Sequence, residues 1–112
     1  LLNEYLEKYQ ENIPPKEYCM LGTKNNFDRF KYLIKKYRGS STSEEKLNLK
    51  KEIAYIVANI EQNHAVLERG GQISKMHLCE GWSFSAQSDD RKATIHIFDT
   101  EGRASRFYFP LK

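Results

Sequence analysis

Two histidines and an arginine near the C-terminus are residue types that can cleave RNA without a metal ion. His77, His96 and Arg106 lie in three separate short segments of alternating polar and apolar residues. Metal-independent cleavage needs a base for the 2′-hydroxyl proton, an acid for the leaving 5′-oxygen and cations for the charge on the phosphorane. Histidine titrates near neutral pH, and arginine can bind phosphate through two parallel hydrogen bonds. This chemistry requires a fold that brings the three side chains together.

The C-terminal part of the chain has the period-2 pattern of antiparallel strands. Two of its turns contain Glu-Gly, which places Gly81 and Gly102 where a three-residue hairpin with a G1 bulge needs a left-handed residue. The middle turn, residues 88–91, is typical of a four-residue loop. The strands are predicted near residues 73–78, 82–87, 92–98 and 103–109.

These turns predict a register that places the apolar residues on one face of the sheet. The first turn pairs Met76 with Phe84, the second pairs Phe84 with Ile95, and the third pairs Ile95 with Phe107. Three independent turn assignments thus agree on one buried face. The residues expected to pack against the helices are Met76, Leu78, Trp82, Phe84, Ile95, Ile97, Phe107 and Phe109.

The same register predicts a polar opposite face with two neighbouring cross-strand rows. One row is His77, Ser83, His96 and Arg106, and the other is Lys75, Ser85, Thr94 and Tyr108. His77 and His96 would lie two strands apart, roughly 10 Å by strand spacing, so both could reach one phosphate. A solvated sheet face is also polar, and this is the plain structural alternative.

From these rows we take His77, His96 and Arg106 as the catalytic candidates. Arg106 would supply a bidentate cation, and other polar residues would bind or orient the substrate. The expected substrate-binding residues are Lys75, Ser83, Thr94, Tyr108, Lys31, Lys35 and Lys36.

Residues 1–69 have the spacing of helices. The first predicted helix ends before Pro14-Pro15, and the second is capped by Thr23, Asn25 or Asn26. The third and longest helix has Thr42 and Glu45 as a candidate capping box and is closed by Gly70-Gly71. The apolar faces are Leu2, Tyr5, Leu6 and Tyr9; then Phe27, Phe30, Leu33, Ile34 and Tyr37; then Leu49, Ile53, Ile56, Val57, Ile60, His64 and Leu67.

The predicted fold class is therefore α+β, with three N-terminal helices packed on a C-terminal four-stranded antiparallel meander sheet. The 112 residues suffice for one domain with one core. Within that domain, residues 1–69 form the helical part and residues 72–110 the sheet. His64 lies on the apolar stripe of the third helix, which favours a structural or boundary role over a catalytic one.

The net charge of +3 conceals one strongly basic helix. Such a stripe attracts phosphates or an acidic partner protein, and a solvated helix face is an equally good interpretation. Residues 24–38 hold Lys24, Arg29, Lys31, Lys35, Lys36 and Arg38 against Asp28 alone.

Cys19 and Cys79 lie far apart and have no metal-ligand spacing around them. We therefore expect two reduced thiols, no zinc or other metal site and no cofactor. Reduced thiols suit a cytoplasmic site of action, and the absence of an initiator Met suggests a domain cut from a longer secreted or delivered protein. No apolar run approaches the ~18 residues that a membrane span needs.

Helices that lead into an antiparallel four-stranded sheet with His, Arg, Lys, Ser and Tyr on its open face resemble the barnase/colicin-type endoribonuclease toxin domains. The resemblance covers the architecture of residues 24–109 and includes no sequence motif. It implies metal-independent cleavage of RNA and an acidic immunity or antitoxin protein as partner. Among RNAs, tRNA is one candidate partner. It also implies a set of functional residues, which are matched by the chemistry of their side chains and not by a sequence motif: His77, His96, Arg106, Lys75, Ser83 and Tyr108.

Two other functions fit the same residues. In a nucleic-acid-binding module without catalysis, the basic helix would contact phosphates and Tyr108 or Phe98 would stack on bases. In a protein-interaction or regulatory domain, the polar face and the basic helix would meet an acidic partner. Nothing in the sequence supports a nucleotide-cofactor enzyme, because it has no Gly-rich phosphate loop, G-x-S-x-G or H-E-x-x-H.

Overall fold

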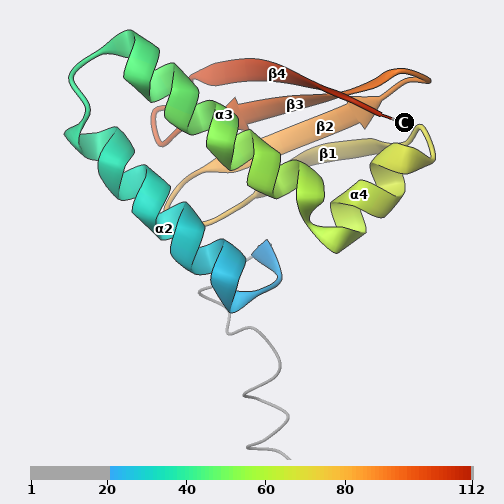
Figure 1. The fold of residues 1–112 in the computed structure, drawn as a ribbon, viewed down its shortest axis with the longest axis horizontal. Coiled ribbons are helices and arrows are strands. Elements are labelled where there is room, and N and C mark those ends of the chain that lie inside the picture. Colours follow the sequence, from blue (N-terminus) through green and yellow to red (C-terminus); the bar gives the residue numbers. More distant parts are fainter. Residues whose placement is uncertain (1–20, 112) are drawn as a thin grey trace, which may run out of the picture.

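The computed structural model describes residues 21–111, which form a layer of helices packed against one face of a sheet (Figure 1). The sheet is antiparallel with strand order β1-β2-β3-β4, so the predicted α+β class with a four-stranded meander is confirmed. The helix predicted around residues 2–9 lies outside the described residues. The elements are α2 (Lys24–Gly39), α3 (Ser43–Asn59), α4 (Glu61–Glu68), β1 (Gln72–His77), β2 (Ser83–Ser88), β3 (Lys92–Phe98) and β4 (Ala104–Pro110).

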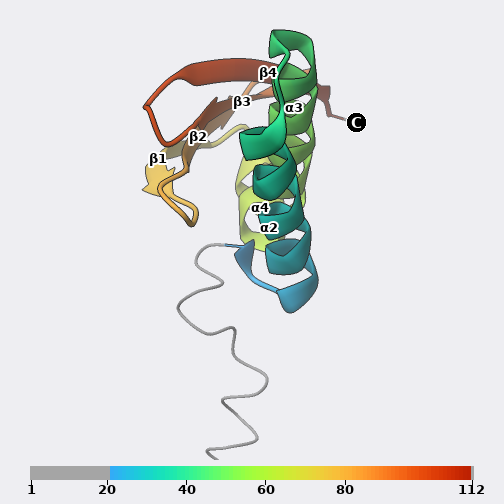
Figure 2. The same ribbon diagram turned by 90° about the vertical axis from the view of Figure 1, so that its left-hand side faces the viewer.

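Helices α2 and α3 begin at two of the predicted capping residues. Thr23 Oγ1 accepts a hydrogen bond from the backbone N–H of Asn26 at 3.1 Å, and Thr42 Oγ1 accepts one from Glu45 at 3.2 Å. Each side chain satisfies an N–H group that has no partner within its helix. The two helices pack side by side, and α3 lies across the sheet (Figure 2). None of the helices in residues 21–111 has the length and apolarity to cross a membrane.

The prediction of one long third helix is wrong, because the structure divides it into α3 and α4. Ile60 adopts an extended conformation at the junction, with φ −61° and ψ 129°. The side-chain amide of Asn63 donates to the carbonyl oxygen of Val57 at 3.0 Å and satisfies an acceptor at the end of α3. Asn63 is therefore buried, while His64 lies on the surface with Nε2 3.4 Å from a carboxylate oxygen of Glu68.

The core lies between the helices and the inner face of the sheet, as predicted. Trp82 joins α2 to the sheet, because its ring makes edge contacts with Phe30 and Tyr37 at centroid distances of 6.3 Å and 4.9 Å. Of the residues predicted to face the helices, six are buried: Leu78, Trp82, Phe84, Ile95, Ile97 and Phe107. Met76 and Phe109 are partly buried against them.

A buried ion pair fastens the turn between β3 and β4 to the helices. Lys50 of α3 and Asp99 are 4% and 5% exposed, and Nζ lies 3.4 Å from Oδ2. Asp99 also accepts hydrogen bonds from the hydroxyl of Tyr37 and from the backbone N–H groups of Glu101 and Arg103. The carboxylate thus connects α2, α3 and the β3–β4 turn.

Cys79 is buried next to the β1–β2 turn and is disulfide-bonded. The prediction of a reduced thiol is therefore wrong for this residue. Disulfide formation depends on how close two cysteines lie in the fold, so wide separation along the chain does not argue against it.

Candidate functional site on the open face of the sheet

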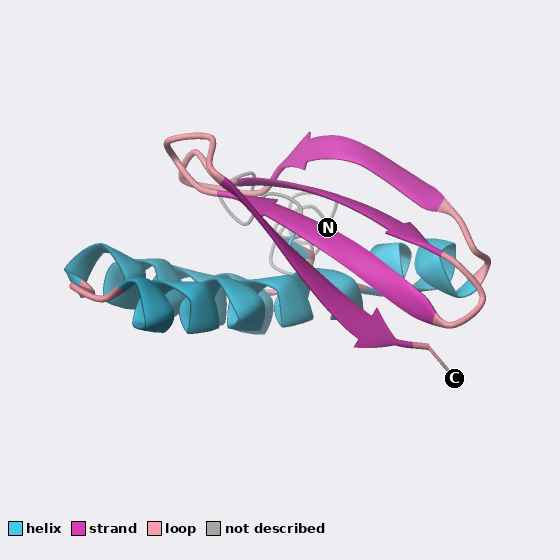
Figure 3. Cartoon of the chain, turned by 90° about the horizontal axis from the view of Figure 1, so that it is seen from above, coloured by secondary structure: helices cyan, strands magenta, loops and turns pink. Residues whose placement is uncertain are grey.

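The turn between β2 and β3 decides which residues meet on the open face, the side of the sheet away from the helices (Figure 3). The predicted four-residue loop is wrong: the backbone N–H of Asp89 donates to the carbonyl oxygen of Lys92 at 3.0 Å, which leaves a two-residue turn at Asp90 and Arg91. The Asp89 carboxylate stabilises this tight turn, because Oδ1 accepts hydrogen bonds from the N–H groups of Arg91 and Lys92 at 2.8 Å and 2.9 Å.

The shorter turn shifts the pairing of β2 with β3 by two residues from the predicted register. Phe84 lies opposite Ile97 and not Ile95. The predicted pairings at the other two turns are confirmed, since Met76 pairs with Phe84 and Ile95 with Phe107. A two-residue shift keeps every side chain on its predicted face but changes its neighbours across the strands.

The predicted row of His77, Ser83, His96 and Arg106 is therefore wrong. The structure retains two of its pairs, His77 with Ser83 and His96 with Arg106. They lie in different rows, because Ser83 pairs with Phe98 of β3. Within the first pair, Nδ1 of His77 lies 3.4 Å from the Ser83 hydroxyl. The two histidines consequently do not converge along one row.

The neighbouring row also differs from its prediction on two strands. Thr94 and Tyr108 are paired as predicted, but Gln87 and Gln72 continue their row in place of Ser85 and Lys75. The two-residue shift of β2 against β3 brings Gln87 into the row, and a register irregularity on β1 between Ile73 and Met76 places Gln72 opposite it. Lys75 lies in that irregular segment, with Nζ 4.3 Å from the centroid of the Phe98 ring. This cation–π contact places Lys75 beside the His77 row.

Two adjoining hollows occupy the open face. The first has a volume of about 330 Å³ and the second about 200 Å³. They share Gln87, Asp89 and Thr94, so we describe them together as the trough. The first hollow is lined by Gln87, Asp89, Lys92, Thr94, His96, Arg106 and Tyr108, and the second by Gly70, Gly71, Gln72, Gln87, Ser88, Asp89 and Thr94.

One end of the trough holds an exposed aromatic ring surrounded by basic groups. Arg106 Nη1 donates to the Tyr108 hydroxyl at 3.3 Å, and this hydrogen bond raises the pKa of Arg106. Lys92 Nζ lies 4.6 Å from the centroid of the Tyr108 ring, and His96 lies opposite Arg106. Tyr108 remains 51% exposed. This end therefore offers two fixed positive charges, one imidazole group and an accessible ring.

Asp89 is the acidic residue among those that line the trough. The backbone hydrogen bonds from Arg91 and Lys92 lower the pKa of its carboxyl group. The group is therefore ionised at neutral pH and can only accept hydrogen bonds. Both hydrogen bonds of the turn use Oδ1, so Oδ2 can accept a hydrogen bond from a ligand.

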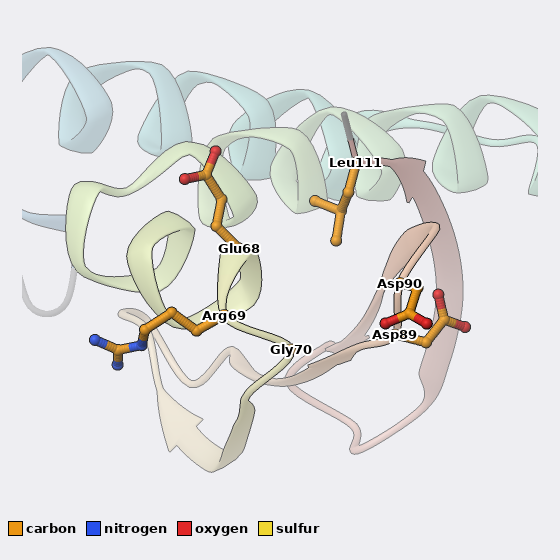
Figure 4. A pocket seen from close by; sticks show the side chains of 6 residues that line it. All are labelled: Glu68, Arg69, Gly70, Asp89, Asp90 and Leu111. Carbon is orange, nitrogen blue, oxygen red and sulfur yellow. The ribbon is translucent and has the colours of Figure 1, made fainter.

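A third hollow, of about 480 Å³, lies beyond Asp89 at the end of α4 (Figure 4). It is lined by acidic residues including Glu68 and Asp90, and the guanidinium group of Arg69 points away from the two aspartates. No group of three potential metal ligands comes together within residues 21–111. An anionic chain would be repelled here and attracted toward the opposite, basic end of the trough.

The basic helix does not contribute to the trough, because α2 belongs to the helical layer on the other side of the sheet (Figure 3). Part of its charge is also neutralised. Lys31 Nζ lies 2.9 Å from Glu80, whose second oxygen lies 3.8 Å from Arg38. The structure thus separates Lys31, Lys35 and Lys36 from the substrate-binding candidates on the sheet.

Seven residues that line the trough were absent from the sequence-based candidates: Gly70, Gly71, Gln72, Gln87, Ser88, Asp89 and Lys92. The local signal that could have found them is Asp89, because aspartate at the start of a turn commonly accepts hydrogen bonds from the next backbone N–H groups. A tight turn at Asp90 and Arg91 brings Gln87 opposite Thr94.

No protein-family model, curated protein or solved structure matches this chain.

Proposed function

We propose that the protein binds single-stranded RNA along the trough on the open face of the sheet. The observation that carries this proposal is the arrangement of Lys92 and Arg106 around the exposed ring of Tyr108. Fixed cations bind phosphates, and an exposed aromatic ring can stack on an unpaired base. The remaining trough residues carry hydrogen-bonding groups, which reach base edges only when the bases are unpaired.

Replacing Lys92 and Arg106 together with alanine should weaken RNA binding on the order of tenfold. The reason is that two charged phosphate contacts are lost, so the dependence of affinity on salt should also become shallower, by about 0.7 in the log–log slope per contact. The measurement is fluorescence anisotropy of a labelled, unstructured RNA of about 12 nucleotides over a series of salt concentrations.

The matched control is the double variant Lys35→Ala with Lys36→Ala, which removes the same charge from α2. It should leave RNA affinity nearly unchanged, because these residues lie in the helical layer. If the α2 variant loses affinity and the trough variant does not, the interface is the basic helix and the proposal is wrong.

The pairing of His96 with Arg106 favours a second candidate function, cleavage of the bound RNA. In this reaction His96 accepts the 2′-hydroxyl proton while the 2′-oxygen attacks phosphorus and the P–O5′ bond breaks. The 5′-oxygen takes its proton from water, and the products are a 2′,3′-cyclic phosphate and a 5′-hydroxyl. Arg106 would neutralise charge on the phosphorane.

His96→Ala should abolish cleavage of tRNA or total RNA assayed with EDTA present, since it removes the proposed base. His77→Ala is the matched control and should retain activity, because His77 lies in another row, beside Ser83. Products separated on a denaturing gel measure the effect. Activity that survives His96→Ala but not His77→Ala would rule out this assignment, and a wild-type chain without cleavage products leaves only the binding function.

We also propose that the protein binds an acidic immunity or antitoxin protein, the partner implied by the resemblance to barnase/colicin-type toxin domains. Its proposed binding surface is α2, because Lys35 and Lys36 are exposed there and lie away from the trough. The disulfide at Cys79 favours a chain that passes through an oxidising compartment, as a secreted or delivered protein does.

A further inference from the structure

We propose that Gln87, Asp89 and Thr94 form a base-recognition corner within the trough, which selects bases carrying an exocyclic amine. This inference rests on the proposed function, because RNA bound at Lys92 and Arg106 delivers the base to the corner. Each of the three residues lines both hollows of the trough.

Among the three residues, Thr94 gives the most direct indication of a ligand. The residue is 9% exposed, it lines both hollows, and its hydroxyl has no hydrogen-bond partner among residues 21–111. A hydroxyl group can both donate and accept a hydrogen bond. A base edge placed in the trough could therefore bond to it.

Gln87 supplies a donor and an acceptor next to this hydroxyl. It lies directly opposite Thr94 and has no side-chain hydrogen bond within the described part of the chain. On β3, Lys92, Thr94 and His96 alternate with inward-facing residues and therefore share the open face. The uncharged side chains of Thr94 and Gln87 thus have groups that can bind phosphate on either side. A nucleotide bound with its phosphate at a flanking position would present its base to the corner.

The position of the corner is fixed by α4 and the Gly70-Gly71 turn. Ser88 Oγ donates to the carbonyl oxygen of Leu67 at 2.6 Å and lies 3.3 Å from that of Gly71. A Cβ at residue 71 would lie 2.6 Å from Val66 Cγ1 and 2.8 Å from the Val66 carbonyl oxygen, so glycine permits this close approach. Groups held in this way can discriminate between ligands without rearrangement.

Asp89 determines which bases fit. An ionised carboxylate accepts a hydrogen bond from the N4 amine of cytosine, and a glutamine amide pairs with the amine side of adenine. Uracil has an oxygen where cytosine has its amine, and a carboxylate repels that oxygen. The corner should therefore prefer cytosine to uracil, two bases of nearly the same size.

The test compares binding of labelled oligo(C) and oligo(U), of about eight nucleotides each, by fluorescence anisotropy. Wild-type protein should bind oligo(C) about fivefold more tightly. Asp89→Asn keeps an oxygen for the N–H groups of Arg91 and Lys92 but replaces the other oxygen with an amide NH2 group. This group can donate to the oxygen of uracil, so the preference should move toward oligo(U). Gln87→Ala should reduce the preference while the cationic residues maintain binding.

Asp90→Asn is the matched control, because it removes the same charge from the same turn at a residue that does not line the trough. Its preference should equal that of the wild type. Equal binding of both oligonucleotides, a preference unchanged in Asp89→Asn and Gln87→Ala, or an equal change in Asp90→Asn overturns the inference and leaves the proposed function standing. No binding to either oligonucleotide overturns the proposed function itself.

Discussion

Asp99→Ala is expected to lower the free energy of unfolding by about 3–5 kcal/mol, because it leaves a buried charge without its partner. Lys50 is 4% exposed, and among residues 21–111 its ammonium group would keep two hydrogen-bond acceptors, the carbonyl oxygen of Arg103 at 3.0 Å and the hydroxyl of Ser105 at 3.2 Å. The change also removes the acceptor for the Tyr37 hydroxyl. Urea denaturation followed by circular dichroism measures the loss.

The exposed ion pair between Arg29 and Glu52 provides the control. Its side chains are 60% and 49% exposed, and the charged atoms lie 3.3 Å apart. Glu52→Ala should cost less than about 1 kcal/mol, because water replaces the lost contact. If Asp99→Ala costs no more than Glu52→Ala, the buried network does not stabilise the fold.

The same carboxylate makes stability depend on pH. Burial raises the pKa of Asp99, but the backbone hydrogen bond from Arg103, the charge of Lys50 and the hydrogen bonds from Tyr37 and Glu101 outweigh it, so the net pKa is lowered. The contribution of Asp99 is therefore fully present above the pKa of the unfolded chain, about 3.9, and is lost as the pH falls through the folded value. Asp99→Asn should show a weaker loss of stability on acidification than the wild type.

Trp82→Ala should destabilise the protein by about 3–5 kcal/mol, because it leaves a large cavity where α2 meets the sheet. Trp82 is 1% exposed, and its ring packs against Phe30 and Tyr37. The same urea denaturation measures the resulting decrease in the free energy of unfolding. The far-UV spectrum before denaturation shows whether the variant still folds.

Trp82→Phe separates packing from hydrogen bonding at this position. Nε1 of Trp82 is buried and has no hydrogen-bond partner within the described residues, so phenylalanine removes an unsatisfied donor while retaining part of the ring. We expect a cost of only about 1 kcal/mol, because removal of that donor offsets part of the lost contact. A cost equal to that of Trp82→Ala would contradict this explanation.

Local signals in the sequence predicted much of the fold. Thr23 and Thr42 cap their helices as predicted, because an N-cap depends only on residues within one turn of the chain. Gly102 has φ +80°, as the predicted bulge at the β3–β4 turn requires. The register of β3 with β4 follows from that turn and is confirmed.

Features that depend on contacts between distant residues were not predicted. The break at Ile60 is accompanied by a hydrogen bond from the side chain of Asn63 to the carbonyl oxygen of Val57, and His64 of the predicted apolar stripe lies on the surface. The ion pair of Lys50 with Asp99 joins residues about half the chain apart, and neither had a distinguishing local pattern.

The sequence by itself determined which residues lie on each face of the sheet, and the tertiary structure decided which of them share a site. The face of the sheet on which a side chain lies depends on alternation with a period of two. The two-residue error at the middle turn therefore left Phe84 and Ile95 on the buried face. The cross-strand row to which a side chain belongs depends on the turn itself, where hydrogen bonds to the carboxylate of Asp89 shorten the loop. That local contact separates His77 from His96 and opens the trough to Gln87 and Thr94.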